Sequence, residues 1–362
     1  MGESKLINGG KAEPVSAATT DYKSAGVDID AGDEVVRQIR RLARGTFTSG
    51  VLSDIGSFGG LFRPELMGVS EPVLVSSADG VGTKLKLAFR TGRHETVGVD
   101  LVNHCVNDIL VQGATPLFFL DYLATGRLST QVTAEVVGGL AAACLDNGCA
   151  LLGGETAEMP GFYADGEYDL AGFIVGLVDR PRLVDSSRMR CGDRLIGLPS
   201  SGLHTNGYSL ARYIVFDKLC LTPDSVPQGI GGSVADVLLR PHRSYLKLIR
   251  PELTKTDSPI TGLAHITGGG LTNNLPRVLP DGTAAEIDPS TWTAQPIFSF
   301  LQQEGSITDA EMFRTFNMGI GMVVVCAGEA TESLLSRFHD AGETGAVEIG
   351  QVTTGNGTVS YV

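Results

Sequence analysis

The sequence has little positive charge and no long apolar run. Lys and Arg number 28 against 41 Asp and Glu, which gives a formal net charge of −13. Nucleic acids and anionic membranes attract basic surfaces, so this balance argues against either as the main partner. No apolar run approaches the length of about 18 residues that crosses a membrane, and the first residues lack the apolar core of a signal peptide. We therefore expect a cytoplasmic protein that binds neither nucleic acid nor membrane.

Cysteine is scarce as well, and its spacing argues against the common cysteine sites. No CxxC pair occurs, and the two cysteines nearest in sequence stand five residues apart with no histidine nearby. Neither a zinc site nor a disulfide framework is expected from such spacings. Most of the cysteines stand among apolar residues and are predicted to be small buried hydrophobes. They are Cys105, Cys144, Cys149, Cys191, Cys220 and Cys326.

Glycine, by contrast, is abundant, since its 47 residues are about twice the usual share. The glycines are clustered and not periodic, which favours loops that approach a ligand closely, most often a phosphate. The length of 362 residues suggests two domains. Residues 1–20 are polar and lack periodicity, which predicts a mobile tail. Polarity rises again around residues 179–190, so we place an N-terminal domain at 21–179 and a C-terminal domain at 180–362.

Hydrophobic periodicity predicts helices and strands in irregular alternation. Helices are expected at 33–44, 101–112, 132–147, 210–218 and near 330–339. Strands are expected at 72–77, 116–122, 149–152, 168–178 and 194–198. Many of these strands could pair as neighbours, so the pattern fits two α+β domains better than a doubly wound sheet.

The segment DGVGTK follows a predicted strand directly and has the residues of a phosphate-binding loop. Gly80 and Gly82 allow a tight turn with exposed N–H groups, and Thr83 offers a hydroxyl. Lys84 supplies a positive charge for phosphate, and Asp79 could hold Mg²⁺. The pattern differs from the Walker motif GxxxxGK[ST], because the lysine follows the threonine. An ordinary β-turn is the alternative interpretation.

Two further carboxylates stand beside loops of the same kind. Asp108 interrupts an apolar helical segment, where aspartate has poor propensity, and this indicates either a ligand or a solvent-facing side chain. Glu155 follows a predicted strand and two glycines, which suits a cation site or an ordinary turn. Asp100 stands near the predicted start of the Asp108 helix and is interpreted as a residue that complements the helix dipole.

The second half contains two polar loops that each precede a predicted helix. The segment SSGLHTNGYS carries His204, which can move a proton near neutral pH, and Asn206. Gly268, Gly269 and Gly270 could form an anion-binding nest of backbone N–H groups. A helix-capping loop and a flexible hinge are the respective alternatives.

The remaining histidines are predicted to be less informative. Three of them, His94, His242 and His339, look like surface residues. His104 is expected to pack on its helix. His265 precedes the glycine run and could support the site from behind.

Seven blocks of sequence together resemble the phosphoribosylformylglycinamidine cyclo-ligase family, in its order and spacing. The resemblance runs from about Asp21 to the C-terminus. The element DxxxxGAxP at 108–116 is shared by a wider superfamily, whereas YKSAGVDIDAG and GGETAEMPG look specific to the cyclo-ligases. The blocks are DYKSAGVDIDAG (21–32), SADGVGTKLKLA (77–88), GVDLVNHCVNDILVQGATPLFFLDY (98–122), LLGGETAEMPG (151–161), SSGLHTNGYSL (200–210), HITGGG (265–270) and FRTFNMGIGM (313–322).

The resemblance implies a fold, an activity and a set of ligands. The fold is α+β, with two domains like those of aminoimidazole ribonucleotide synthetase: an N-terminal domain that forms a dimeric β-barrel and a C-terminal α/β sandwich. The activity is ATP-dependent cyclisation of formylglycinamidine ribonucleotide in a homodimer that uses Mg²⁺, with potassium as a supporting cation. Another ATP-dependent member of the superfamily, or a catalytically silent nucleotide-binding partner, would be the alternatives.

The family's functional residues carry over to named positions of this sequence. Asp79 and Asp108 match carboxylates for ATP and metal, and Glu155 matches a further metal carboxylate. Lys84 matches a lysine that contacts phosphate, which makes it a predicted catalytic residue. In the second domain His204 and Asn206 match the active-site loop and are predicted to be catalytic.

Two positions depart from the family's usual pattern. Arg40 stands where a lysine thought to meet ATP is usual, so it keeps the charge with a different geometry. Ser57 stands in a glycine-rich loop that usually reads GGFGG and slightly restricts that loop. The resemblance places ATP near the dimer interface, and the nest at 268–270 could hold the ribose phosphate of the substrate.

Overall fold

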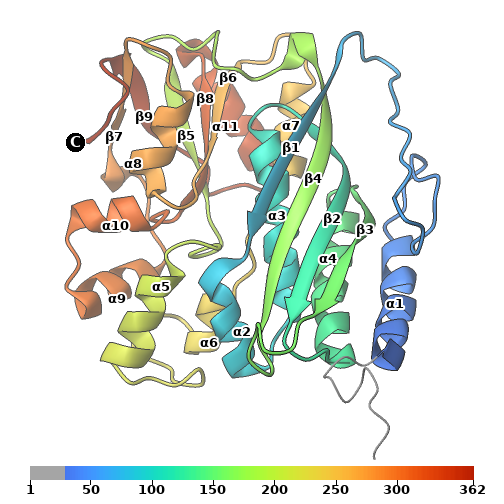
Figure 1. Cartoon of the computed structure of the whole chain (residues 1–362). Coiled ribbons are helices and arrows are strands. Elements are labelled where there is room, and N and C mark those ends of the chain that lie inside the picture. Colours follow the sequence, from blue (N-terminus) through green and yellow to red (C-terminus); the bar gives the residue numbers. More distant parts are fainter. Residues whose placement is uncertain (1–28) are drawn as a thin grey trace, which may run out of the picture.

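The structure is a computed structural model that describes residues 29–362. The predicted tail at 1–20 and most of the block at 21–32 lie outside the described residues. The first four strands form one sheet in the order β1-β4-β2-β3, and the last six form a second sheet in the order β10-β7-β9-β5-β8-β6 (Figure 1). The change from one sheet to the other falls between Asp179 and Arg194. The exact domain boundary stays a prediction.

Strands and helices alternate along both halves of the chain. The strands are β1 Pro72–Gly80, β2 Thr115–Thr125, β3 Ala150–Glu158, β4 Tyr168–Asp179, β5 Arg194–Pro199, β6 Ile260–His265, β7 Thr283–Ile287, β8 Ile320–Cys326, β9 Val347–Thr354 and β10 Val359–Tyr361. The α-helices are α1 Ile29–Arg44, α2 Leu85–Thr91, α3 Glu95–Leu110, α4 Thr130–Asp146, α5 Tyr208–Arg212, α6 Val234–Leu238, α7 Leu246–Leu253, α8 Gly270–Asn274, α9 Pro296–Gly305, α10 Asp309–Thr315 and α11 Thr331–Asp340. A π-helical segment, Tyr213–Lys218, continues α5.

Helices cover only one face of the four-stranded sheet. Helices α3 and α4 pack there closely, because Gly98 and Gly139 lie where a Cβ atom would collide with the backbone of the other helix. The opposite face is left open by residues 29–362 and carries apolar side chains, among them Leu74 at 66% and Phe173 at 46% relative exposure. The predicted barrel is therefore not closed by one chain, whose four strands form an open sheet with β1 and β3 as its edges.

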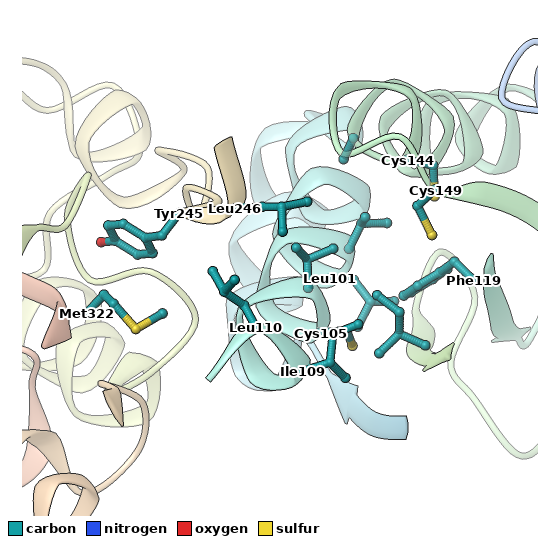
Figure 2. Packing of buried hydrophobic residues seen from close by; sticks show 14 of the residues in the cluster. Leu101, Cys105, Ile109, Leu110, Phe119, Cys144, Cys149, Tyr245, Leu246 and Met322 are labelled. Carbon is teal, nitrogen blue, oxygen red and sulfur yellow. The ribbon is translucent and has the colours of Figure 1, made fainter. Parts of the chain in front are cut away.

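Helix α3 lies between the two sheets and is buried on nearly all sides. One apolar cluster runs through it from the first sheet to the second domain. Figure 2 shows Phe119 and Cys149 on one side of the helix and Tyr245 and Met322 on the other, with Leu110 between them. A helix with apolar contacts all around it is typical of a protein centre. The two domains therefore share a continuous core across α3.

Several predicted boundaries change, and two of the changes affect the site. Helix α3 begins at Glu95 and not near residue 101, so Asp100 lies in its second turn and its predicted capping role is wrong. Strand β3 continues to Glu158, so Glu155 lies within the strand and not in a turn after it. Cys191 and Cys220 are exposed and the other four cysteines are buried, as most were predicted to be. Among the described residues, no helix is long and apolar enough to cross a membrane.

Candidate functional site

A cavity of about 690 Å³ lies between the two domains. One wall comes from the end of β1 and from α3, and includes Asp79 and Asp108. The other wall comes from β6, the loop after it and the segment after α8, and includes His265, Thr267 and Arg277. We call this cavity the cleft. The fold thus brings together two carboxylates that are 29 residues apart in the sequence, opposite a polar wall from the second domain.

Each cleft carboxylate is held by a histidine and by a neighbouring donor. Asp79 accepts from His104 Nε2 at 2.8 Å and from the Gly80 N–H at 2.7 Å. Asp108 accepts from His265 Nδ1 at 2.8 Å and from the Ser77 hydroxyl at 3.0 Å. Burial opposes ionisation of both carboxyls, but these hydrogen bonds and the histidine charge hold the pKa of each below its usual range. Both carboxylates are therefore ionised at neutral pH and ready to bind a cation.

Behind the carboxylates lies a cluster of buried histidines from both domains. His265 Nε2 lies 3.0 Å from His242 Nε2, and the His242 ring stacks on His204 with 3.9 Å between centroids. Burial and neighbouring positive groups lower the pKa of His204 and His242 well below the usual value, so both are neutral. The two rings are stacked, with an angle of 21° between their planes. The cluster therefore supports the cleft carboxylates from behind through hydrogen bonds and ring contacts.

Hydrogen bonds link the cluster to Asp79 as well. His242 Nδ1 lies 3.4 Å from the Thr205 hydroxyl, which lies 2.7 Å from His104 Nδ1. His104 Nε2 then donates to Asp79. Burial works against the charged form of His104, but the nearby carboxylates outweigh it and raise the pKa of His104. A continuous path of hydrogen bonds thus joins Asp79 to Asp108 through both domains, with its positive charge favoured at His104.

Lys84 is not among the residues that line the cleft, and its predicted contact with phosphate stays a prediction. Its side chain is fully buried and pairs with Asp100, with 2.7 Å between Nζ and Oδ2. It also donates to the carbonyl oxygens of His204 and Arg240. All three of its N–H donors are therefore used inside the protein. The sequence pattern could not reveal this, because the covering residues belong to the second domain.

The rest of the DGVGTK segment is also used within the structure. The Gly80 N–H donates to Asp79 and so is not free for an anion. Gly82 has a φ of +66°, which suits the tight turn that was predicted. Thr83 lies 3.1 Å from the Ser209 hydroxyl of the second domain. The segment therefore positions Asp79 and joins the domains.

The second-domain loops lie mostly behind the cleft. His204 is fully buried and is not among the residues that line the cleft, and its catalytic role stays a prediction. Asn206 is half-buried and lies beside Gly268. The Gly270 N–H donates to the Thr267 carbonyl, and a Cβ at Gly270 would collide with the Phe313 carbonyl, so Gly270 serves a tight turn. The predicted anion-binding nest at 268–270 stays a prediction.

Arg40 and Glu155 lie at a second cavity, of about 620 Å³, at the β3 edge of the sheet. We call it the edge cavity. It is lined by α1, β2, β3 and the glycine-rich loop 54–60, with Glu155 and the buried Asp121 among its residues. Arg40 donates from Nε to the Ile55 carbonyl at 3.0 Å and lies against Gly56, so it braces this loop. The Ser57 position lies in the same wall.

The three predicted metal carboxylates therefore do not meet within one chain. Asp79 lies on β1 and Glu155 on β3, at opposite edges of the sheet. The strand register places Asp79 level with Gly154, three strand spacings or about 14 Å away. Sequence reasoning placed both at strand ends but could not supply the strand order. Only Asp79 and Asp108 converge.

Sequence reasoning also missed residues of the cluster. His242 was predicted at the surface but is fully buried in the cluster, and His94 is buried against Tyr168. The supporting position predicted for His265 is confirmed by its bond to Asp108. His104 is buried on α3, as predicted. Nothing in the short segment around His242 signals burial, because its partners come from distant parts of the chain.

Comparisons with known proteins agree along the whole chain. Residues 66–178 match the N-terminal domain of AIR synthase related proteins, and residues 190–362 match the C-terminal domain. The chain is 50% identical over 350 residues to the phosphoribosylformylglycinamidine cyclo-ligase of Geotalea uraniireducens, covering 96% of this chain and all of that protein. It is 52% identical over 343 residues to the enzyme of the same name from Myxococcus xanthus, covering 95% of this chain and 99% of that protein.

Solved structures with the same fold are more distant in sequence. The hydrogenase maturation protein HypE of E. coli matches with a TM-score of 0.65 at 17% identity, over 91% of this chain and 93% of that one. A thiamine-monophosphate kinase from Stenotrophomonas maltophilia matches with a TM-score of 0.61 at 18% identity, over 91% of this chain and 95% of that one. These likenesses concern the two-domain fold.

Proposed function

The chain belongs to the phosphoribosylformylglycinamidine cyclo-ligase family, and from that premise we propose that its chemistry takes place in the cleft between the two domains. The protein is a ligase of de novo purine biosynthesis. It catalyses the ATP-dependent cyclisation of formylglycinamidine ribonucleotide to 5-aminoimidazole ribonucleotide, with release of ADP and phosphate. The observation that carries the placement is the convergence of Asp79 and Asp108 opposite a polar wall.

The reaction needs phosphoryl transfer and then ring closure. A formyl oxygen is a poor leaving group, so it attacks the terminal phosphorus of ATP and ADP departs. The nitrogen that closes the ring then attacks the activated carbon, and the oxygen leaves as part of phosphate. Transfers of this kind depend mainly on positioning and on neutralising charge. We assign the positioning to the cleft walls, where Arg277 has guanidinium N–H groups available to the substrate beyond the one that it donates to Asn274.

Asp79 and Asp108 fit a magnesium ion. Hard carboxylate oxygens are the ligands that Mg²⁺ prefers. The two side chains keep 42% and 25% of their surface accessible and face the cleft. A bound ion would offset the negative charge of the ATP phosphates. His104 and His265 orient the carboxylates from behind, as hydrogen-bonded groups behind a metal site generally do.

A second copy of the chain would complete this site, and the open sheet favours that arrangement. The exposed apolar face and the free edges β1 and β3 are costly to leave in water, and a dimeric barrel buries both. In the dimer that we propose, the barrel closes with β1 of one protomer beside β3 of the other. Glu155 of the partner subunit would then approach Asp79, and the partner's edge cavity would adjoin the cleft.

The edge cavity is suited to the nucleotide end of ATP. It combines the glycine-rich loop with apolar side chains of α1 and β3, while Arg40 lies beside it as a cation. Apolar walls with few polar groups are typical of sites that hold a purine ring. The nucleotide would thus extend from the edge cavity of one protomer to the cleft of the other.

Phosphate release tests the reaction itself. We expect release from ATP only when formylglycinamidine ribonucleotide is present, together with formation of the imidazole product. Release without the substrate would favour another ATP-dependent activity. Nucleotide binding without any release would favour a catalytically silent partner.

Subunit complementation tests the shared site. Asp79→Asn and Glu155→Gln should each be nearly inactive as homodimers. Mixed dimers would contain one site with both native carboxylates, so an equimolar mixture that exchanges subunits should recover about a quarter of the wild-type activity. The matched control mixes Asp79→Asn with Asp108→Asn, which share a wall of one protomer and should not recover. Equal recovery in both mixtures, or none in either, would refute the shared site.

A further inference from the structure

A fully buried ion pair lies beneath the histidine cluster. Lys84 precedes α2 and Asp100 lies in α3, and neither side chain has any exposed surface. Lys84 Nζ lies 2.7 and 2.8 Å from the two Asp100 oxygens. A buried ion pair is usually no more stabilising than apolar residues of the same size, because both charges lose their hydration. The contacts of the pair therefore indicate what it contributes besides stability.

All further hydrogen-bond partners of the pair are backbone groups of the second domain, and Lys84 Nζ also lies over the Tyr208 ring, 5.4 Å from its centroid. Lys84 donates to the carbonyl oxygens of His204 at 3.1 Å and Arg240 at 2.9 Å. Asp100 accepts from the His242 N–H at 2.6 Å. Two residues of the N-terminal domain thus bind two separate loops of the C-terminal domain, and these loops carry His204 and His242.

The backbone at these contacts is in a conformation that needs support. His204 has a φ of +60°, in the left-handed region that side-chain-bearing residues rarely adopt. Its ring is pressed against His242, with an angle of 21° between the ring planes. His242 in turn meets His265, which donates to Asp108 in the cleft. A shift of the His204 loop would therefore reach Asp108 through two ring contacts, and a shift of the His242 loop through one.

We propose that the Lys84–Asp100 ion pair is a positioning device that holds the two histidine loops, and through them the cleft carboxylate Asp108, in the reactive arrangement. Neither residue touches the substrate. The inference rests on the proposed placement of the reaction in the cleft. It differs from the phosphate contact that the sequence suggested for Lys84, because it assigns the charge of the lysine side chain to the interior and its effect to catalysis through other residues.

Replacement of both charges separates positioning from stability. Lys84→Met alone leaves Asp100 charged and unpaired in the interior, so its melting temperature should fall strongly. The double variant Lys84→Met/Asp100→Leu removes both charges and should recover much of that loss. Its kcat should nevertheless stay about 100-fold below wild type, because loss of alignment of even about 1 Å has this effect. Its KM for ATP should change far less.

Two further variants complete the design. Lys86→Met removes a half-exposed lysine two residues away, paired with Glu167 at the surface, and should leave kcat unchanged. Asp100→Asn preserves side-chain shape and keeps an oxygen acceptor for the His242 N–H, so it changes the charge with little change of packing. It leaves the Lys84 charge without its counterion, so its melting temperature should also fall, and it is compared with wild type well below that temperature. It is expected to lower kcat and to shift the ring resonances of His204 and His242 in histidine-selective NMR.

The outcomes separate this inference from the proposed function. A folded double variant, or Asp100→Asn, with wild-type kcat would overturn the inference. Unchanged histidine resonances in Asp100→Asn would overturn it too. If the wild-type protein released no phosphate with its substrate, the proposed function would fail, whereas the resonance shifts would still report whether the pair holds the histidine loops.

Discussion

The cleft and the edge cavity have similar volumes but differ in how their walls are held. The cleft carboxylates each receive two hydrogen bonds from side chains or backbone, and buried histidines lie behind them. The edge cavity is bounded by a loop of mostly exposed residues, 54–60, and by the last strand of an open sheet. Phe58 in that loop is fully exposed in this chain.

This difference indicates which half of the site one chain can build alone. A wall fixed by buried hydrogen bonds keeps its geometry without a partner, because moving it would leave polar groups unpaired. A wall that ends at a free strand edge and exposed apolar side chains lacks such constraints. We therefore expect the cleft to be preorganised in the monomer, and the edge cavity to acquire its final shape on dimerisation.

The largest effect on activity is expected from a substitution in the cleft wall that buried hydrogen bonds hold in place. Asp108→Asn should lower kcat/KM by at least about 100-fold, since even residues behind a metal ligand typically contribute 10- to 100-fold. Calorimetry should show weaker binding of ATP with Mg²⁺, and circular dichroism should show an unchanged fold. Asp257→Asn, at an exposed carboxylate away from both cavities, is the control. Unchanged nucleotide affinity would remove Asp108 from the site.

A charge on the open sheet face should disrupt the proposed dimer, on which the shape of the edge cavity depends. Leu74→Asp would place a carboxylate in the proposed dimer contact, so light scattering at micromolar concentration should change from a dimeric to a monomeric mass. Activity should fall with the dimer, because each cleft would lose Glu155 of the partner subunit. Leu145→Asp is a matched control, since Leu145 is 64% exposed against 66% for Leu74 but lies on α4. A wild-type monomer at this concentration would contradict the proposal.

Loosening the glycine-rich loop should have a smaller effect. Arg40→Ala removes the bond to the Ile55 carbonyl and a nearby positive charge, so the KM for ATP should rise about 10-fold while kcat changes little. Arg40→Lys should raise it less, because the charge remains but the fork of donors is lost. The exposed neighbour Arg41→Ala serves as control in the same steady-state assay. An unchanged KM in Arg40→Ala would show that the edge cavity does not depend on this residue.

A substitution at Asp121 should have the smallest effect on activity. Its main effect should be on how stability depends on pH. Burial raises the pKa of Asp121 to about 7 in the folded protein. The unfolded chain ionises near pH 4, so the unfolded state binds fewer protons than the folded state between about pH 4 and pH 7. Stability should therefore fall as pH rises through this window, by up to about 4 kcal/mol. Asp121→Asn should lose this slope and melt at a higher temperature than wild type at pH 8. Parallel wild-type and variant curves across pH 5–8 would contradict the assignment.

The predicted elements and motifs were closest to the structure where the evidence was local. The alternation of apolar residues located β1, β2 and β4 to within a few residues of their ends. The helix boundary before Asp108 was less accurate, because α3 is buried on nearly all sides and its polar side, with Asp100 and His104, faces the second domain and not solvent. Lys84 and His204 were correctly singled out as unusual, but their surroundings could not be foreseen. Burial by the other domain decides whether such a side chain meets ligand or protein.

The sequence by itself determined the family and the two-domain α+β architecture, and it singled out the carboxylates Asp79 and Asp108. These conclusions depend on patterns within short segments, which can be recognised without knowing how distant parts of the chain pack. Tertiary structure alone decided that Lys84 pairs with Asp100, that His242 is interior and that Glu155 lies across the sheet from Asp79. Each of these depends on strand order or on contact between residues more than a dozen positions apart, and chain folding brings such groups together at distances that no local pattern encodes.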